Sequence, residues 1–285
     1  MPQTSLISTG HRARGIVQRT HGRTGGPVTR LMSPDDLGQF LKPYVFLDLF
    51  AVEPETPTRF ALHPHSGIAT LTALTSGEMN YKRRDGEPAS LTEGGIEWMM
   101  AGGGVWHGSS LTAPARAKGF QLWVALPPEF ENADSEEVFL TSDQIAAVGP
   151  ARVLLGEYQR VRSLVNPPFP MTYLHITLKA DEAWTFVPPI THDVAWIALD
   201  RGCLMVEGEA APIRASELAA FAYGTDPILI IAKESTSFVL GSARRHPHDL
   251  VTGHYSVHTN SAALAQGEAR IDELGAELRR TGRLK

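Results

Sequence analysis

The chain has 285 residues and a formal net charge of −5. This length exceeds the common size of one domain, so we expect two domains or one large all-β unit. The negative charge gives no overall attraction to nucleic acid or to an anionic membrane, and the single cysteine, Cys203, excludes an internal disulfide.

The apolar pattern of the chain predicts a soluble, cytoplasmic protein. The N-terminal segment lacks the continuous apolar core of a signal peptide, and no apolar run in the chain reaches the roughly twenty residues of a membrane span. The segment is rich in arginine, which could indicate a basic arm. However, residues 16–19 alternate like an edge strand, where charged side chains protect against aggregation. We therefore expect a solvated edge strand here and no direct contact with nucleic acid.

Many short apolar segments separated by Gly and Pro predict strands through most of the chain. The run from Tyr44 to Val52 is apolar except for Asp48, as in a strand buried on both faces, so Asp48 needs a partner. Similar segments lie at 70–74, 96–100 and 120–126, and the stretch around Cys203 predicts a buried strand with an inert thiol. The pattern indicates an all-β fold of β-barrels or sandwiches.

A weak internal repeat divides the chain into two halves. Residues 70–77 match residues 195–202 at an offset of about 125 residues. We predict an N-terminal domain over 1–135 and a C-terminal domain over 136–285, with an acidic connector at 131–150. The apolar residues of 261–280 recur near helical spacing, so one closing helix is expected there, with Ser261 as its N-cap.

The pair His63 and His65 is the best functional clue in the first half. On a strand, residues at i and i+2 point to one face, so both imidazoles can approach a common point. His107 follows the glycine run 102–104, which gives the backbone the freedom to bring in a third imidazole. Neutral imidazole suits iron, copper, nickel and zinc. At the repeat offset these positions become Pro188 and Ile190, so the second half has no ligand set.

A second triplet, His246-Pro247-His248, lies among polar residues and outside any strand pattern. We interpret it as a connecting loop before the last helix and not as a metal site. The chain has no GxSxG elbow and no Walker loop, and the nearest acids to the first triplet, Glu78 and Glu97, are expected to face solvent or a turn. A general base is therefore not assigned.

Five segments together resemble the pirin family, the bicupins of the cupin superfamily. They are YVFLDLF at 44–50, HPHSGIATLTALTSGEM at 63–79, EGGIEWMMAGGGVWHGS at 93–109, GFQLWVAL at 119–126 and the tail RRHPHDLVTGHYSVHTNSAALAQ at 244–266. The resemblance implies two cupin (jelly-roll) β-barrels in tandem. It also implies one divalent transition metal in the N-terminal barrel, held by His63, His65 and His107. Iron is the first expectation, with nickel, manganese, copper, cobalt and zinc as alternatives.

The chain departs from the family pattern at this same site. The fourth ligand of pirins, a glutamate, falls on Ser109, and two further acids of the family pattern fall on Ala69 and Gly95. Three neutral imidazoles would leave a divalent ion near +2, and a carboxylate would reduce this to about +1. The altered site should favour anionic ligands, with Ser109 in a supporting role toward a metal-bound water.

By resemblance, the expected activity is that of a quercetinase-like dioxygenase acting on a small aromatic or enolisable substrate. Two alternatives stay open. One is a metal-dependent, redox-sensing regulatory module that binds a protein partner, and the other is a degenerate cupin without metal.

Overall fold

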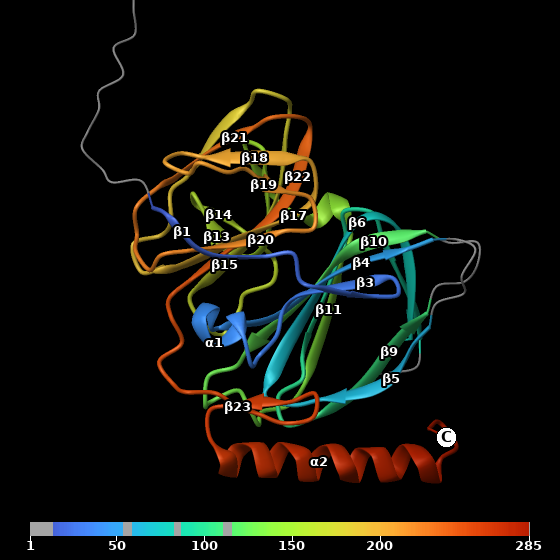
Figure 1. The fold of residues 1–285 in the computed structure, drawn as a ribbon. Coiled ribbons are helices and arrows are strands. Elements are labelled where there is room, and N and C mark those ends of the chain that lie inside the picture. The colour runs from blue at the N-terminus through green and yellow to red at the C-terminus, as the bar shows by residue number, and fades with distance from the viewer. Residues whose placement is uncertain (1–13, 54–58, 83–86, 111–115, 285) are drawn as a thin grey trace, which may run out of the picture.

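The computed structural model describes residues 14–53, 59–82, 87–110 and 116–284, with the backbone alone at 59–60, 81–82 and 109–110. Within this part the regular secondary structure consists mainly of strands, followed by one long C-terminal helix, as predicted (Figure 1). The all-β prediction is confirmed, although the sheets pack face to face and are not closed into barrels.

The first half forms a ten-stranded sheet. Its main path runs β11-β8-β6-β10-β4-β3-β2, with β7 and β9 on the long strand β6 and with β5 on β9. The strands are β2 (Arg23–Gly25), β3 (Val28–Met32), β4 (Tyr44–Val52), β5 (Arg59–His65), β6 (Ile68–Lys82), β7 (Pro88–Thr92), β8 (Ile96–Met100), β9 (Val105–Ser110), β10 (Ala117–Ala125) and β11 (Glu136–Leu140).

The second half forms an eight-stranded sheet and a four-stranded sheet. The larger one has the order β1-β20-β17-β22-β15-β13-β12, with β14 on β13, and the smaller one has the order β16-β21-β18-β19. The larger sheet contains β1 (Ile16–Thr20), β12 (Ala147–Val148), β13 (Ala151–Tyr158), β14 (Val161–Arg162), β15 (Met171–Leu178), β17 (Val194–Arg201), β20 (Leu218–Phe221) and β22 (Thr236–Ala243). The smaller sheet contains β16 (Ala183–Phe186), β18 (Cys203–Val206), β19 (Ile213–Arg214) and β21 (Ile228–Ala232).

The remaining elements are short, except for the last helix. They are α1 (Leu37–Leu41), the 3₁₀ turn Ser142–Gln144, β23 (Val251–Thr252), β24 (Val257–His258) and α2 (Ser261–Arg280). Helix α2 has the predicted bounds, but its N-cap is Asn260, whose side chain accepts a hydrogen bond from the Ala263 amide. The prediction of Ser261 as N-cap was one residue late. No helix in the described part of the chain is both long and apolar enough to cross a membrane.

The internal repeat corresponds to a repeated strand order. The path β8-β6-β10-β4-β3 of the first sheet has the same form as β20-β17-β22-β15-β13 of the second. The two large sheets pack against each other through one apolar core that includes Leu47 and Trp98 from one sheet and Trp196 and Val239 from the other. A second core fills the space between the eight-stranded and four-stranded sheets and surrounds the β18 strand that carries the buried Cys203.

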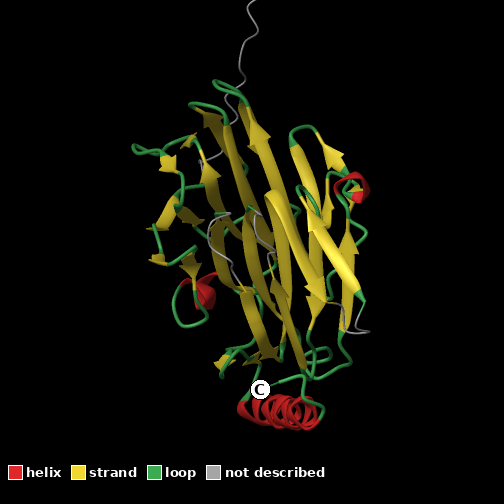
Figure 2. Cartoon of the chain, turned by 90° about the vertical axis from the view of Figure 1, so that its right-hand side faces the viewer, coloured by secondary structure: helices red, strands yellow, loops and turns green. Residues whose placement is uncertain are grey.

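The two halves exchange their chain ends. Strand β1 near the N-terminus is the edge of the second large sheet, which confirms the predicted edge strand, while β23, β24 and α2 pack on the first half. Strand β11, which lies beyond the predicted boundary at residue 135, pairs with β8 of the first sheet. Helix α2 lies across the open end of the first half, beside β5 and β9 (Figures 1 and 2).

Candidate metal centre

His63 and His65 on β5 and His107 on the paired strand β9 lie close together. Each offers one ring nitrogen, and the three nitrogens lie within 4.8 Å of one another. Strand pairing explains this, because His63 stands directly opposite His107 in the antiparallel register, while Pro64 faces Trp106. Directly opposed residues share a face of the sheet, and so do i and i+2 on one strand. The pairing of two strands therefore brings all three imidazoles to one side.

The residues between and before the histidines permit this pairing. Pro64 has no N–H group, and β5 pairs with β9 alone, so a proline is tolerated at this edge. The turn from β8 to β9 passes through Gly102 at φ +52°, where a Cβ atom would lie 2.1 Å from the carbonyl oxygen of Ala133. Only glycine fits there. The glycine run thus sets the start of β9 and, with it, the register of His107.

Hydrogen bonds leave the Nε2 atoms of the cluster free to bind a cation. His63 Nδ1 lies 2.7 Å from the carbonyl oxygen of Ala61, and His65 Nδ1 lies 3.1 Å from that of Tyr255. A carbonyl oxygen only accepts, so both Nδ1 atoms carry the proton and Nε2 keeps its lone pair. His107 Nε2 is buried and has no hydrogen-bond partner among the described residues. An orphaned buried nitrogen beside two free lone pairs fits a metal ion.

The electrostatics also favour neutral imidazoles. Burial, together with the neighbouring His63, lowers the pKa of His65 to about 3. Burial lowers the pKa of His107 well below its ordinary value, and that of His63 is lowered for the same reason. At neutral pH the three rings are therefore uncharged, so a cation meets no positive charge in the cluster. This donor set is suited to a divalent transition metal.

The second triplet does not join a cluster. His246 to His248 lie in a loop, as predicted, with His248 exposed and His246 buried against the ring of Phe169 at 5.5 Å. In the described part of the chain, the first triplet with His107 is the one group of three that could hold a metal ion. Two identical tripeptides thus have different surroundings, because only the first is paired with a strand that carries a third histidine.

The positions that depart from the family pattern supply no carboxylate. Ser109 belongs to β9, and its side chain lies outside the described part of the structure. Ala69 is buried in β6 opposite Met100. Gly95 is closely packed, with a hypothetical Cβ only 2.9 Å from the carbonyl oxygen of Leu140. The ligand set that can be described is therefore the three histidines.

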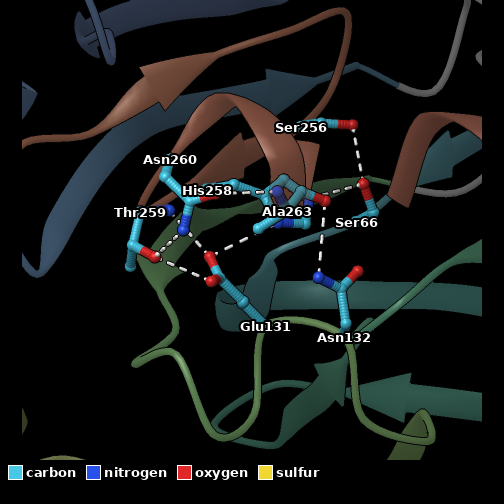
Figure 3. Close-up of polar contacts among 8 residues, drawn as sticks. All are labelled: Ser66, Glu131, Asn132, Ser256, His258, Thr259, Asn260 and Ala263. Carbon is cyan, nitrogen blue, oxygen red and sulfur yellow. Dashed lines mark hydrogen bonds and ion pairs between the residues drawn. The ribbon is translucent and has the colours of Figure 1, made fainter. Parts of the chain in front are cut away.

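The C-terminal segment around Ser256 and His258 is hydrogen-bonded to Ser66, the residue directly after His65 (Figure 3). Ser66 Oγ lies 3.0 Å from His258 Nε2 and donates to Ser256 Oγ at 3.0 Å. His258 Nδ1 lies 3.4 Å from Glu131 Oε2, and the same carboxylate accepts hydrogen bonds from the amide and hydroxyl of Thr259. Ser66, His258 and Glu131 resemble a hydrolase triad in order, but all three are buried, so no substrate reaches Ser66.

This network has a structural consequence for the cluster. It holds the 254–258 segment in place, and the carbonyl oxygen of Tyr255 in that segment orients His65. A hydrogen bond to the second ring nitrogen fixes the tautomer and the direction of a ligating histidine. Sequence reasoning did not find this contribution, because Tyr255 and His258 lie about 190 residues from the triplet.

A cavity of about 1030 Å³ contains the cluster. Its wall carries a ring stack in which Phe46 lies parallel to Trp123 at 4.0 Å, and Trp123 meets His65 edge to face at 4.8 Å. Arg30 covers the other side of Phe46 and pairs with Asp48, at 2.6 Å and 3.1 Å, which supplies the partner predicted for Asp48. Flat aromatic surfaces of this kind suit a flat aromatic ligand.

The expectation for Glu97 was wrong. It does not face solvent or a turn but is completely buried in β8, where its Oε2 atom lies 2.8 Å from Thr72 Oγ1. Burial raises its pKa to about 7. Glu78, by contrast, is exposed and accepts a hydrogen bond from Ser90. The position of Glu97 between Ile96 and Trp98, in a strand with no other polar residue, was the signal that it is buried.

Comparison with known proteins is consistent across sequence and structure. The sequence model of the pirin family matches residues 27–124. A pirin-like protein of Caulobacter vibrioides is 30% identical over 216 residues, which cover 70% of this chain and 73% of that protein. For two other curated relatives, the match covers 54% and 62% of their lengths.

Solved structures share the fold, and two of them serve as examples. A quercetin 2,3-dioxygenase from Acinetobacter baumannii superimposes with a TM-score of 0.83 at 20% identity, covering 92% of this chain and 98% of that one. A bacterial pirin from Escherichia coli in complex with nickel(II) gives a TM-score of 0.64 at 19% identity, covering 82% of this chain and 96% of that one. At this level of identity the likeness establishes the bicupin architecture.

Proposed function

The chain belongs to the pirin family, and from that premise we propose that it is a metal-dependent dioxygenase of the quercetinase type. The observation that carries this proposal is the meeting of three imidazole nitrogens within 4.8 Å in a cavity walled by aromatic rings. His63, His65 and His107 would hold one divalent transition metal, with iron as the first expectation. The relatives support a metal, since one neighbour of the same fold contains nickel(II).

The three-histidine set would determine which ligands bind. A bound divalent ion would supply Lewis acidity toward an oxygen ligand and a place for dioxygen chemistry. Neutral imidazoles do not offset its charge, so the centre would attract an anionic oxygen such as the enolate of a flavonol. The cavity would accept the rings of that substrate along the part of its wall that Trp106, Trp123 and Tyr255 line.

The chain's own residues would orient the substrate and hold the ligands in place. The Tyr255 carbonyl keeps the proton of His65 on Nδ1, and the Ala61 carbonyl does the same for His63. Trp106, beside His107 on β9, donates a hydrogen bond from Nε1 to the carbonyl oxygen of Ile271 in α2. The helix therefore closes this side of the cavity, which limits access of water to the reacting oxygen.

Oxygen uptake with flavonols tests the activity. Protein reconstituted with Fe²⁺ is expected to consume oxygen with 3-hydroxyflavone and to leave flavone, which lacks the enolisable hydroxyl, unchanged. His107→Ala should abolish the uptake, and His248→Ala, in the second triplet, should leave it intact. Metal-loaded protein that consumes no oxygen with any enolisable aromatic substrate would contradict the proposal and favour the regulatory alternative.

A further inference from the structure

A row of polar side chains crosses the first sheet. Its members stand directly opposite one another on five neighbouring strands, in the order Arg30 on β3, Asp48 on β4, Gln121 on β10, Thr72 on β6 and Glu97 on β8. Directly opposed residues point to the same face of a sheet. The first four line the cavity that contains the histidines, and Glu97 ends the row in the interior.

The hydroxyl of Thr72 fixes the direction of the hydrogen bonds in this row. Thr72 Oγ1 lies 2.8 Å from Glu97 Oε2 and 2.8 Å from Gln121 Oε1. A hydroxyl has one proton, so it donates to only one of these oxygens and must accept from the other. The amide oxygen of Gln121 cannot donate, whereas a neutral carboxyl of Glu97 can. The order is therefore Glu97 to Thr72 to Gln121.

The surroundings of Glu97 support its neutral form. Its second oxygen, Oε1, is buried without a hydrogen-bond partner in the described part of the chain, which would be costly for a carboxylate. On β11 the opposed residue is the apolar Phe139, and the nearby Glu137 disfavours a second negative charge. The guanidinium of Arg30 lies at the far end of the row and is engaged by Asp48.

The same order leaves the amide nitrogen of Gln121 without an acceptor. Its Nε2 atom is buried and has no partner among the described residues, and Gln121 is part of the cavity wall. Trp123 stands two residues further on β10, on the same face, and its ring contacts His65 at 4.8 Å. The free N–H group thus belongs to the wall of the cavity that contains the histidine cluster.

We propose that Glu97 is a positioning residue that, through Thr72, holds the Gln121 amide with its N–H toward the cavity, where it donates to an oxygen of the ligand. The chemical class of that ligand is a flat aromatic compound with a carbonyl or anionic oxygen beside its metal-binding oxygen. The location of the ligand rests on the proposed function. The direction of the amide does not, since it is the orientation in which Gln121 Oε1 lies 2.8 Å from Thr72 Oγ1.

Ionisation of Glu97 would reverse the direction of the hydrogen bonds along this row. Thr72 would then donate to the carboxylate and accept from the Gln121 amide, so the carbonyl oxygen of Gln121 would face the cavity. An oxygen ligand would lose a donor and meet a second acceptor. Because burial raises the pKa of Glu97 to about 7, affinity for such a ligand should fall as the pH rises through neutrality.

Binding of 3-hydroxyflavone to the metal-reconstituted full chain, measured from pH 6 to 8.5, tests the ligand contact. Wild-type affinity should fall about tenfold over this range relative to Glu97→Gln, which stays neutral and still donates to Thr72. At pH 6 the affinities of wild type and Glu97→Gln should agree within about twofold.

Gln121→Glu, which has no N–H, should bind about tenfold more weakly than wild type at pH 6. Glu136→Gln, on the exposed surface of β11, is the matched control. Identical pH profiles for wild type and Glu97→Gln would overturn the proposal.

A second measurement separates this proposal from the proposed function. The glutamate carboxyl carbons are labelled with ¹³C, and the Glu97 signal is identified by its loss in Glu97→Gln. A titration midpoint near neutrality is expected with or without metal, and a midpoint near that of an exposed glutamate would overturn the proposal. If the wild type binds neither metal nor flavonol, the proposed function fails and this midpoint alone decides the direction of the row.

Discussion

Glu97 and Thr72 face each other on neighbouring strands, with 2.8 Å between the carboxyl oxygen and the hydroxyl oxygen, on the side of the sheet opposite the main apolar core. A completely buried carboxyl with one short contact should affect stability in a way that depends on pH. The protonation state of Glu97 should therefore affect both the folding free energy and the direction of the Gln121 amide in the cavity wall.

Replacement of Glu97 by glutamine should remove a pH-dependent loss of stability. The pKa of Glu97 is raised from its ordinary value to about 7 in the folded chain, so the folded state keeps a proton that the unfolded chain has released. The free energy of unfolding then falls as the pH rises from the ordinary pKa of a glutamate to the raised pKa of about 7. The total loss is about 3 kcal/mol at most.

Urea unfolding of wild type and Glu97→Gln at pH 5 and pH 8 measures this effect. Relative to wild type, the variant should gain about 3 kcal/mol between the two pH values, while Glu136→Gln should show no such change. An equal difference at both pH values would mean that Glu97 titrates normally in the folded protein.

Loss of the Glu131 carboxylate should loosen the C-terminal segment. Glu131 accepts from the amide and hydroxyl of Thr259 and lies against His258, and all of these contacts are buried or partly buried. Glu131→Gln should lower the free energy of unfolding by about 1–3 kcal/mol and weaken metal binding, because the Tyr255 carbonyl no longer fixes His65. Glu273→Gln on α2 breaks only an exposed pair with Arg270 and should change neither quantity. A metal affinity unaffected by Glu131→Gln would show that the hydrogen bonds of Glu131 do not help to position the three histidines.

A methyl group at Gly267 should destabilise the protein although it favours the helix. Alanine in place of glycine is worth about 1 kcal/mol inside a helix. Here a Cβ would lie 2.6 Å from both His258 Nε2 and Ser66 Oγ, so either α2 or these two buried, hydrogen-bonded side chains would have to shift. Gly267→Ala should lower the thermal midpoint, whereas Gln266→Ala on the exposed side of the same helix should leave it unchanged or raise it. A raised midpoint for Gly267→Ala would show that the helix does not pack as closely as described.

A carboxylate at position 109 should tighten metal binding. The resemblance to pirins places a glutamate ligand there, and its charge would reduce a divalent centre from about +2 to about +1. Ser109→Glu is expected to raise the affinity for Fe²⁺ about tenfold in competition with a chelator. Ser110→Glu introduces the same charge one residue further along β9 and serves as the control. Equal affinities for the two variants would mean that the family's fourth ligand position has no counterpart in this chain.

The sequence predicted local features better than long-range contacts. Alternation within β5 indicated that His63 and His65 share a face, and the glycine run indicated the turn before His107. The repeat at residues 70–77 and 195–202 corresponds to the central strands β6 and β17 of the two large sheets. In each case the signal lies within one strand or one turn, where period and turn chemistry determine the structure.

The missed features depend on contacts between distant segments. Nothing near Tyr255 indicates that its carbonyl would reach His65, because the tail folds back over about 190 residues. Glu97 was misassigned because a single carboxylate suggests an exposed position, although its neighbours in the strand are all apolar. The exchange of β1 and the C-terminal tail between the two halves has no local signature, and the domain division at residue 135 stays a prediction.

The most direct test of the three-histidine centre is elemental analysis of protein purified without a histidine tag. Wild type is expected to contain about one equivalent of a transition metal, with His107→Ala falling below about a tenth of an equivalent and His248→Ala keeping the wild-type content. A wild-type protein below about a tenth of an equivalent, or a His107→Ala variant with unchanged metal, would contradict the assignment of His63, His65 and His107 as the ligands.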